Sequence, residues 1–205
     1  MNIKKELEVQ QREITLLFAR IAQNRIFGMD GHIERTAFYV KHMIETMLIL
    51  GLYFKEMRDW DMELVISSSY LHDIGKITLP DSILNKPGKL TDEEYSVFKS
   101  YPLESKHIIE QLEEKTGSSE FLTSAKQFAA YHRENWDGSG YPHGLKGNDI
   151  PLKGRIMAIA DEYDELTSES PYKKAYTKEK AIEIIRSKSG TRFDPDLVEI
   201  FCSII

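Results

Sequence analysis

The chain has 205 residues, a formal net charge of −6 and one cysteine, Cys202. The negative charge offers no basic surface that would recruit a nucleic acid polymer, and a single cysteine excludes an internal disulfide framework and a zinc–thiolate cluster. No stretch approaches the ~20 apolar residues of a membrane span, and the polar residues 1–6 do not form a signal peptide. We therefore expect a globular cytoplasmic protein without a membrane anchor.

The first predicted helix, residues 2–25, has an apolar seam whose members alternate between spacings of four and three residues. The seam consists of Ile3, Leu7, Ile14, Leu17 and Ile21, with the polar Gln10 at one position. Such a heptad pattern is typical of helices that pair with each other. Two interpretations remain open: a helix that packs on its own domain, or a linker helix that dimerises or transmits a signal. The domain prediction places the linker helix at residues 1–25 and one helical domain at residues 26–205.

Helical patterns continue along most of the chain, and no strand-like alternation is long enough to predict a sheet. The predicted helices span 31–50, 61–72, 155–166 and 178–187, with another ending near His132 and a last one after residues 194–195. Thr91 and Glu94 predict a capping box at the start of a further helix. Residues 79–88 and 136–152 contain turn residues and predict irregular segments. The pattern therefore predicts an all-α fold.

A histidine followed by an aspartate, His72-Asp73, ends the helix predicted at 61–72. Imidazole and carboxylate groups are both common metal ligands. Asp161 follows the apolar run 156–160, where a buried carboxylate is costly unless it meets a cation. Together with His32 these residues form a set of two histidines and two carboxylates, which suits a divalent transition metal such as iron, manganese, zinc or nickel.

Two other polar residues accompany this candidate metal set. Lys76 follows the His-Asp pair by one turn and could offer its ammonium group to a phosphate, while His132 stands at the entrance to the glycine-rich segment. The alternative for each single histidine is a hydrogen-bonded residue of the core or surface.

Six motifs in this order carry a family resemblance. They read LHDIGK at 71–76, LNKPGKLT at 84–91, WDGSGYP at 136–142, ADEYD at 160–164, LTS at 166–168 and GTRFDP at 190–195. Together they resemble the HD-GYP family of metal-dependent phosphohydrolases, over about residues 10–204. The resemblance implies an HD-domain helical bundle that hydrolyses the bacterial messenger cyclic di-GMP at a site with two or three metal ions. Many members are output domains of response regulators, which agrees with an N-terminal linker helix.

The resemblance also assigns the metal positions. The first position matches the family fully, with His32, His72, Asp73 and Asp161. The second position is degenerate, because Tyr101 and Arg133 stand where the family has histidines and only His132 remains as a ligand. We therefore expect one ion per chain.

Other family positions also differ. The glutamate of members with a third metal is Gly28 here, and the family's phosphate-binding arginine is Ser170. We expect substrate contacts from Arg133, Tyr141 and Lys173. Catalytic roles fall to the residues that would hold the ion and offer positive charge to the phosphate, Asp73 and Lys76.

Tyr101 and Arg133 are poor replacements for histidine ligands. A phenol with a reference pKa near ~10 seldom binds divalent metals at neutral pH, and a guanidinium stays protonated and cannot ligate. Arg133 could therefore replace a cation electrostatically; the alternative is that it points to solvent.

Two functional hypotheses follow. The first is a slow or altered cyclic di-GMP phosphodiesterase. The second is an inactive HD-GYP domain that senses a nucleotide or docks partner proteins through the loop 138–142. In either case the first helix offers a route to a homodimer.

Overall fold

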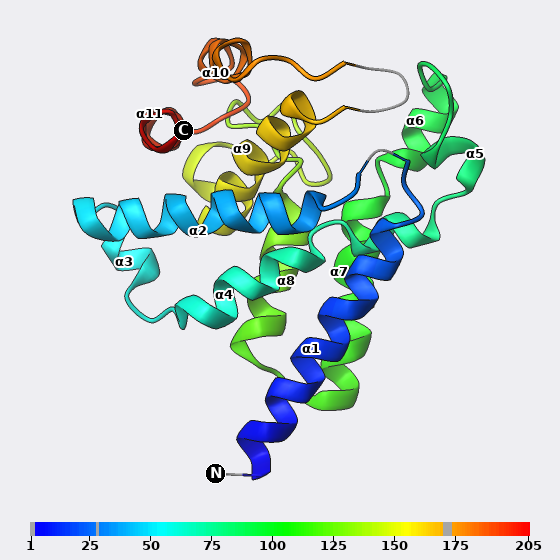
Figure 1. Ribbon diagram of the computed structural model, residues 1–205, viewed down its shortest axis with the longest axis vertical. Helices are drawn as coiled ribbons and strands as arrows, with labels where there is room; N and C mark the ends of the chain where they lie inside the picture. Colours follow the sequence, from blue (N-terminus) through cyan, green and yellow to red (C-terminus); the bar gives the residue numbers. More distant parts are fainter. Residues whose placement is uncertain (1–2, 28, 170–173) are drawn as a thin grey trace.

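The computed structural model describes residues 3–27, 29–169 and 174–205, which form an all-α bundle (Figure 1). The helices are α1 (Ile3–Gln23), α2 (His32–Leu50), α3 (Phe54–Met57), α4 (Met62–Ser68), α5 (Asp81–Leu84), α6 (Asp92–Phe98), α7 (Tyr101–Thr116), α8 (Glu120–Tyr131), α9 (Leu152–Thr167), α10 (Lys178–Ser187) and α11 (Pro195–Ile204). Three 3-10 turns complete them: η1 (Ser69–Leu71), η2 (Ile74–Thr78) and η3 (Gly147–Asp149). Within these ranges there is no strand, only an isolated bridge, so the all-α prediction is confirmed.

Most of the predicted elements lie where the sequence placed them. The capping box is present: Thr91 Oγ1 accepts from the Glu94 amide, and the Glu94 carboxylate accepts from the Thr91 amide at 2.7 Å. Two short helices, α3 and α5, were not predicted, and α5 lies inside the segment predicted to be a loop. Each spans four residues, which is too short to show a 3.6-residue period.

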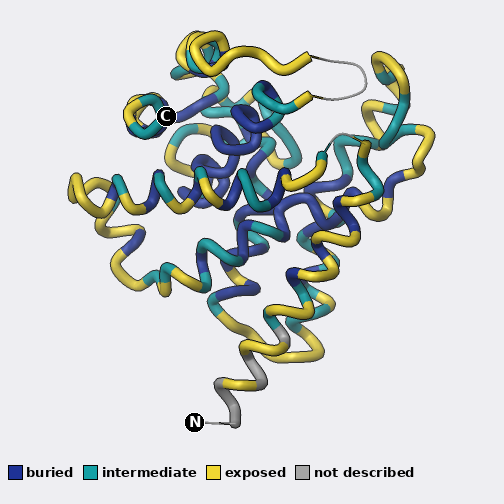
Figure 2. Tube along the Cα trace, viewed as in Figure 1, coloured by how far each residue is buried: buried dark blue, intermediate teal, exposed yellow. Residues whose placement is uncertain are grey.

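Helix α9 forms the centre of the bundle and is buried along almost its whole length. It packs against α2, α8 and α10, and the tube in Figure 2 is dark blue where these elements meet. The larger core cluster combines apolar residues of α2, α9 and the C-terminal helices, among them Met43, Ile156, Ile159 and Phe201. Because α9 is surrounded, its polar side chains must find partners inside the protein.

Helix α1 has two apolar faces. Leu16, Ala19 and Ala22 are buried in a second core cluster with residues of α7 and α8. By contrast, the seam residues Leu17 and Ile21 are 54% and 53% exposed. Figure 1 shows the N-terminal part of this helix projecting from the bundle. The helix thus packs on its own domain through one face, while the described seam residues Ile14, Leu17 and Ile21 stay exposed.

The described helices include none that is both long enough and apolar enough to cross a membrane.

The turn η2 lies against the start of α7, and this close approach depends on Gly75. A Cβ added there would lie 2.3 Å from both the Tyr101 carbonyl oxygen and the Ser105 amide nitrogen. The Gly75 amide also donates to Ser105 Oγ at 2.7 Å. The contact sets Asp73 beside Tyr101, so it positions two residues of the candidate site.

We expect Gly75→Ala to destabilise the fold by about 3 kcal/mol, because the added methyl group would overlap backbone atoms that cannot rotate away. Gly51→Ala is the matched control: Gly51 has a positive φ of 67° but nothing within 4 Å of an added Cβ. Backbone strain alone should cost about 1 kcal/mol there. Urea denaturation measures both values, and equal losses would contradict the steric explanation.

Candidate metal centre

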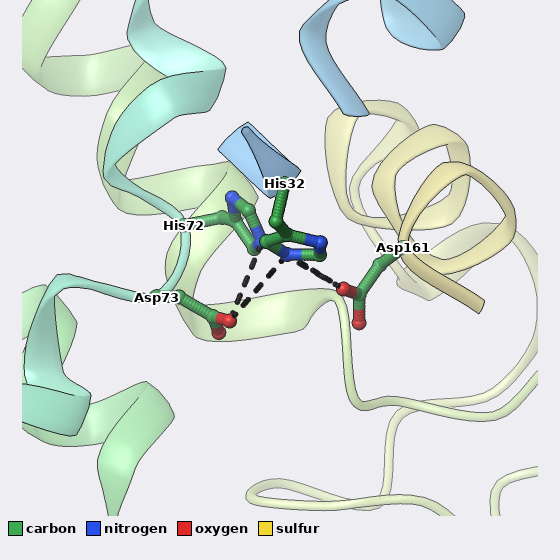
Figure 3. A group of neighbouring side chains, drawn as sticks. All are labelled: His32, His72, Asp73 and Asp161. Atoms are coloured by element: carbon green, nitrogen blue, oxygen red, sulfur yellow. Dashed lines mark hydrogen bonds and ion pairs between the residues drawn. The ribbon is translucent and has the colours of Figure 1, made fainter. Parts of the chain in front are cut away.

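The four residues predicted as metal ligands meet in the interior of the bundle (Figure 3). His32 is the first residue of α2, His72 and Asp73 join η1 to η2, and Asp161 lies in the middle of α9. All four are buried, and their ligand atoms lie within 4.8 Å of one another. Segments far apart in the sequence therefore supply one compact group, here called the four-donor group.

The spacing within the four-donor group suits a single ion. His32 Nε2 lies 3.3 Å from His72 Nε2, 3.3 Å from Asp161 Oδ1 and 3.9 Å from Asp73 Oδ2. His72 Nε2 lies 3.6 Å from Asp73 Oδ2. Tetrahedral ligands about 2.1 Å from a metal are separated by about 3.4 Å. The four donors therefore need only small adjustments to bind one cation.

Hydrogen bonds behind the histidines turn their Nε2 atoms toward the centre. His32 Nδ1 faces Asp164 Oδ2 at 2.7 Å, and His72 Nδ1 faces the Ser69 carbonyl oxygen at 2.9 Å. Both partners are acceptors, so each Nδ1 donates a hydrogen bond and each Nε2 is the ring nitrogen turned toward the centre, where a metal would take the place of any proton on it. Asp164 is itself fixed by Arg35, whose Nε donates to Asp164 Oδ1 at 2.6 Å.

The carboxylates of the four-donor group are ionised and short of donors. Burial alone would raise the pKa of Asp161, but Arg133 and His32 hold it well below its usual range. Burial also opposes ionisation of Asp73, yet Lys76 and His72 hold the pKa of that carboxyl well below its usual range. Among the described residues, Asp73 Oδ1 and both oxygens of Asp161 accept no hydrogen bond. Buried anionic oxygens of this kind fit a bound cation.

The same charges act on His32. Burial alone would lower its pKa, but the carboxylates of Asp161 and Asp164, which face its two ring nitrogens, raise the pKa of this imidazole to about 9. The centre therefore favours positive charge at this position.

Arg133 points into the protein, which excludes the alternative that it faces solvent. Its Nη2 lies 2.8 Å from Asp161 Oδ2 and 2.9 Å from Glu165 Oε1, and its side chain is 10% exposed. Its Nε donates to Tyr101 Oη at 2.5 Å. The guanidinium thus neutralises one of the two carboxylates of the four-donor group.

His132 lies beside the four-donor group and not within it. Its Nε2 is 2.7 Å from Tyr101 Oη and 3.5 Å from Asp73 Oδ1. Its Nδ1 lies 2.9 Å from the Ala129 carbonyl oxygen, which can only accept a hydrogen bond. The Tyr101 hydroxyl therefore donates to His132 Nε2 and uses the lone pair that a metal would need.

The other predicted site residues have distinct surroundings. Lys76 is buried, pairs with Asp73 Oδ2 and lies over the Tyr101 ring, with Nζ 5.1 Å from its centroid. Burial raises the pKa of Tyr141 to about 12, so its phenol stays a hydrogen-bond donor. The three positions at 28, 170 and 173, including the substrate contact predicted for Lys173, lie outside the described residues.

Sequence reasoning missed the residues that orient His32. Asp164 follows Asp161 by three residues on α9, and Arg35 follows His32 by three residues on α2. Side chains at this spacing share a helix face. A search for polar residues one turn from each predicted ligand could therefore have found both.

We expect Asp164→Asn to weaken metal binding by about 10- to 100-fold, because an amide cannot satisfy both the His32 Nδ1 proton and the Arg35 guanidinium. Ser168→Ala is the control, since Ser168 hydrogen-bonds to Arg35 and Asp164 but not to His32. Chelator competition measures the affinity of each purified variant. An unchanged affinity in Asp164→Asn would contradict the orienting role.

Comparison with known proteins places the chain among related sequences. A model of the HD domain family matches residues 17–197. A cyclic di-GMP phosphodiesterase of Vibrio cholerae is 42% identical over 94% of this chain, and a 3'3'-cGAMP-specific phosphodiesterase 2 of the same organism is 34% identical over 98%. The chain spans only 39% and 36% of these two relatives.

A solved structure shows the same fold at low sequence identity. Bd1817, described as an HDG"Y"P protein from Bdellovibrio bacteriovorus, superimposes with a TM-score of 0.59 at 17% identity and covers 87% of this chain and 54% of its own. The family match, which spans most of the chain, leads to one conclusion: the chain belongs to the HD domain family.

Proposed function

We propose that this domain is a metal-dependent phosphodiesterase that hydrolyses a cyclic dinucleotide such as cyclic di-GMP. The observation that carries the proposal is the four-donor group, with ionised carboxylate oxygens that accept no hydrogen bond among the described residues. The names of the two Vibrio cholerae relatives support cyclic dinucleotides as the substrate class. The donors suit one ion of iron, manganese, zinc or nickel.

The proposed roles follow from position and charge. A bound transition metal would supply a water of lowered pKa and positive charge for a phosphate oxygen. His32, His72, Asp73 and Asp161 would hold that ion, and Asp73 also pairs with Lys76.

The second set of proposed roles concerns the substrate. Arg133 and Lys76 bring positive charge toward a phosphate, and the Tyr141 phenol donates to its oxygens. Lys173 lies outside the described residues, and its role as a second donor rests on the family resemblance alone. Because Arg133 and Lys76 already pair with carboxylates, their help to the transition state is reduced. Losing one such donor commonly lowers a rate by ~10²–10³-fold, so we expect slow hydrolysis.

A second candidate function is an inactive domain that senses a nucleotide or docks a partner protein. The observation that favours it is the guanidinium of Arg133, which is already paired with Asp161 and Glu165. The loop 138–142 would be the docking element. Glu134 anchors this loop region, because its carboxylate accepts from the amides of His143 and Leu145.

The test is turnover of cyclic di-GMP and 3'3'-cGAMP by protein loaded with iron, manganese or zinc. We expect slow formation of linear product, abolished in Asp73→Ala, and a loss of about 10²-fold in Lys76→Met. Lys41→Met, on the exposed face of α2, is the matched control and should leave the rate unchanged. Nucleotide binding without turnover above Asp73→Ala, with every metal, would support the sensing module instead.

We also propose that the linker helix at residues 1–25 pairs two copies of the chain through its heptad seam. The uncovered seam residues Ile14, Leu17 and Ile21 support this, since they are 55%, 54% and 53% exposed. Leu17→Glu should convert a dimer into a monomer in light scattering. Val9→Glu is the matched control, because Val9 is exposed on the same helix but lies outside the seam. A monomeric wild type would contradict the proposal.

A further inference from the structure

Each carboxylate of the four-donor group directs one oxygen away from it. Asp161 Oδ1 faces His32, whereas Asp161 Oδ2 lies 2.8 Å from Arg133 Nη2. Asp73 Oδ2 faces His72, whereas Asp73 Oδ1 lies 3.5 Å from His132 Nε2. Two carboxylates that each offer a second oxygen could share a second cation beside the first.

A continuous series of hydrogen-bonded side chains occupies the space beside these two outward oxygens, where a second cation would bind. Arg133 pairs with Asp161 and donates to Tyr101 Oη, and Tyr101 donates to His132 Nε2 at 2.7 Å. His132 completes the chain next to Asp73 Oδ1. Tyr101 and His132 are almost completely buried, at 0% and 1% exposed. A second metal ion would have to displace the guanidinium and break the hydrogen bond between Tyr101 and His132.

We infer that the Arg133–Tyr101–His132 chain takes the place of a second metal ion and limits this centre to one. The guanidinium is a permanent cation held against Asp161, and it offers no lone pair to a metal. Tyr101 is a positioning residue, since it fixes Arg133 on one side and occupies the His132 lone pair on the other. The inference rests on the proposed metal centre and deepens it.

The guanidinium also defines what the second side of the centre can bind. An arginine presents planar, directional N–H donors that match the oxygens of a phosphate. Glu165, 37% exposed in its side chain, shares Nη2 of Arg133 with Asp161. A phosphate diester approaching Arg133 would therefore meet a guanidinium whose Nε and Nη2 are already engaged, where a two-metal centre would offer an ion.

Metal counting tests the inference without measuring activity. Each variant is loaded with excess manganese or zinc, passed through a desalting column and analysed for metal per chain by mass spectrometry. We expect one ion in the wild type and in Tyr101→Phe, which removes the hydroxyl but adds no donor. The double variant Tyr101→His with Arg133→His should hold two. Two tightly held ions in the wild type would refute the inference, and none would refute the proposed metal centre.

A second measurement applies even if the double variant fails to fold. Arg133→Met removes the positive charge at similar size, so the first ion should bind at least about tenfold more tightly. Arg192→Met is the matched control. Arg192 pairs with Glu162 on α9, the helix that carries Asp161, and not with one of the four donors. Chelator competition gives both affinities. An unchanged or weaker affinity in Arg133→Met would overturn the inferred electrostatic role.

Discussion

The burial of two ionised carboxylates, Asp73 and Asp161, is the constraint on which the rest of this structure depends. Both side chains are almost wholly excluded from solvent. A buried carboxylate that loses its partner commonly destabilises a fold by about 3–5 kcal/mol. The surrounding elements stabilise the two buried carboxylates with imidazole, ammonium and guanidinium groups. The same arrangement that makes the carboxylates tolerable in the core also makes the interior a place for a cation.

The bundle satisfies the constraint by bringing polar side chains from separate helices to the buried middle of α9. The helix start at His32, the turn between η1 and η2 and the end of α8 all converge on it. The approach of η2 to α7 at Gly75 sets the distance between Asp73 and Tyr101. Packing that looks purely structural therefore determines which donor atoms face one another.

The sequence allowed much of this to be predicted, for physical reasons. Long helices show their period directly, and capping residues such as Thr91 act on their own helix, so both are local signals. The four donors could be found because histidine and aspartate beside apolar runs are unusual, and the family resemblance joined them. The short helices α3 and α5 are too brief to carry a period.

Long-range side-chain geometry could not be predicted in the same way. The inward turn of Arg133, and the hydrogen bond from Tyr101 to His132, join residues about thirty positions apart. Their direction follows from acceptors behind His132, the carbonyl oxygens at the end of α8. No local pattern records which nitrogen of an imidazole faces such an acceptor. The sequence therefore showed that Tyr101 and Arg133 were unusual, and only the packed bundle shows how they work together.

The difference between a metal ion and a guanidinium then decides what the centre can do. A metal ion accepts lone pairs, so it can bind a water and lower the pKa of that water. A guanidinium keeps its protons at neutral pH and only donates hydrogen bonds, so it can hold a phosphate but cannot generate a nucleophile. Because Arg133 pairs with Asp161, one side of the centre offers ligands for a metal ion and the other side offers only a guanidinium. Under the proposed function, activation of water would fall to an ion on the side of His32 and His72, while the opposite side would contribute only charge and orientation.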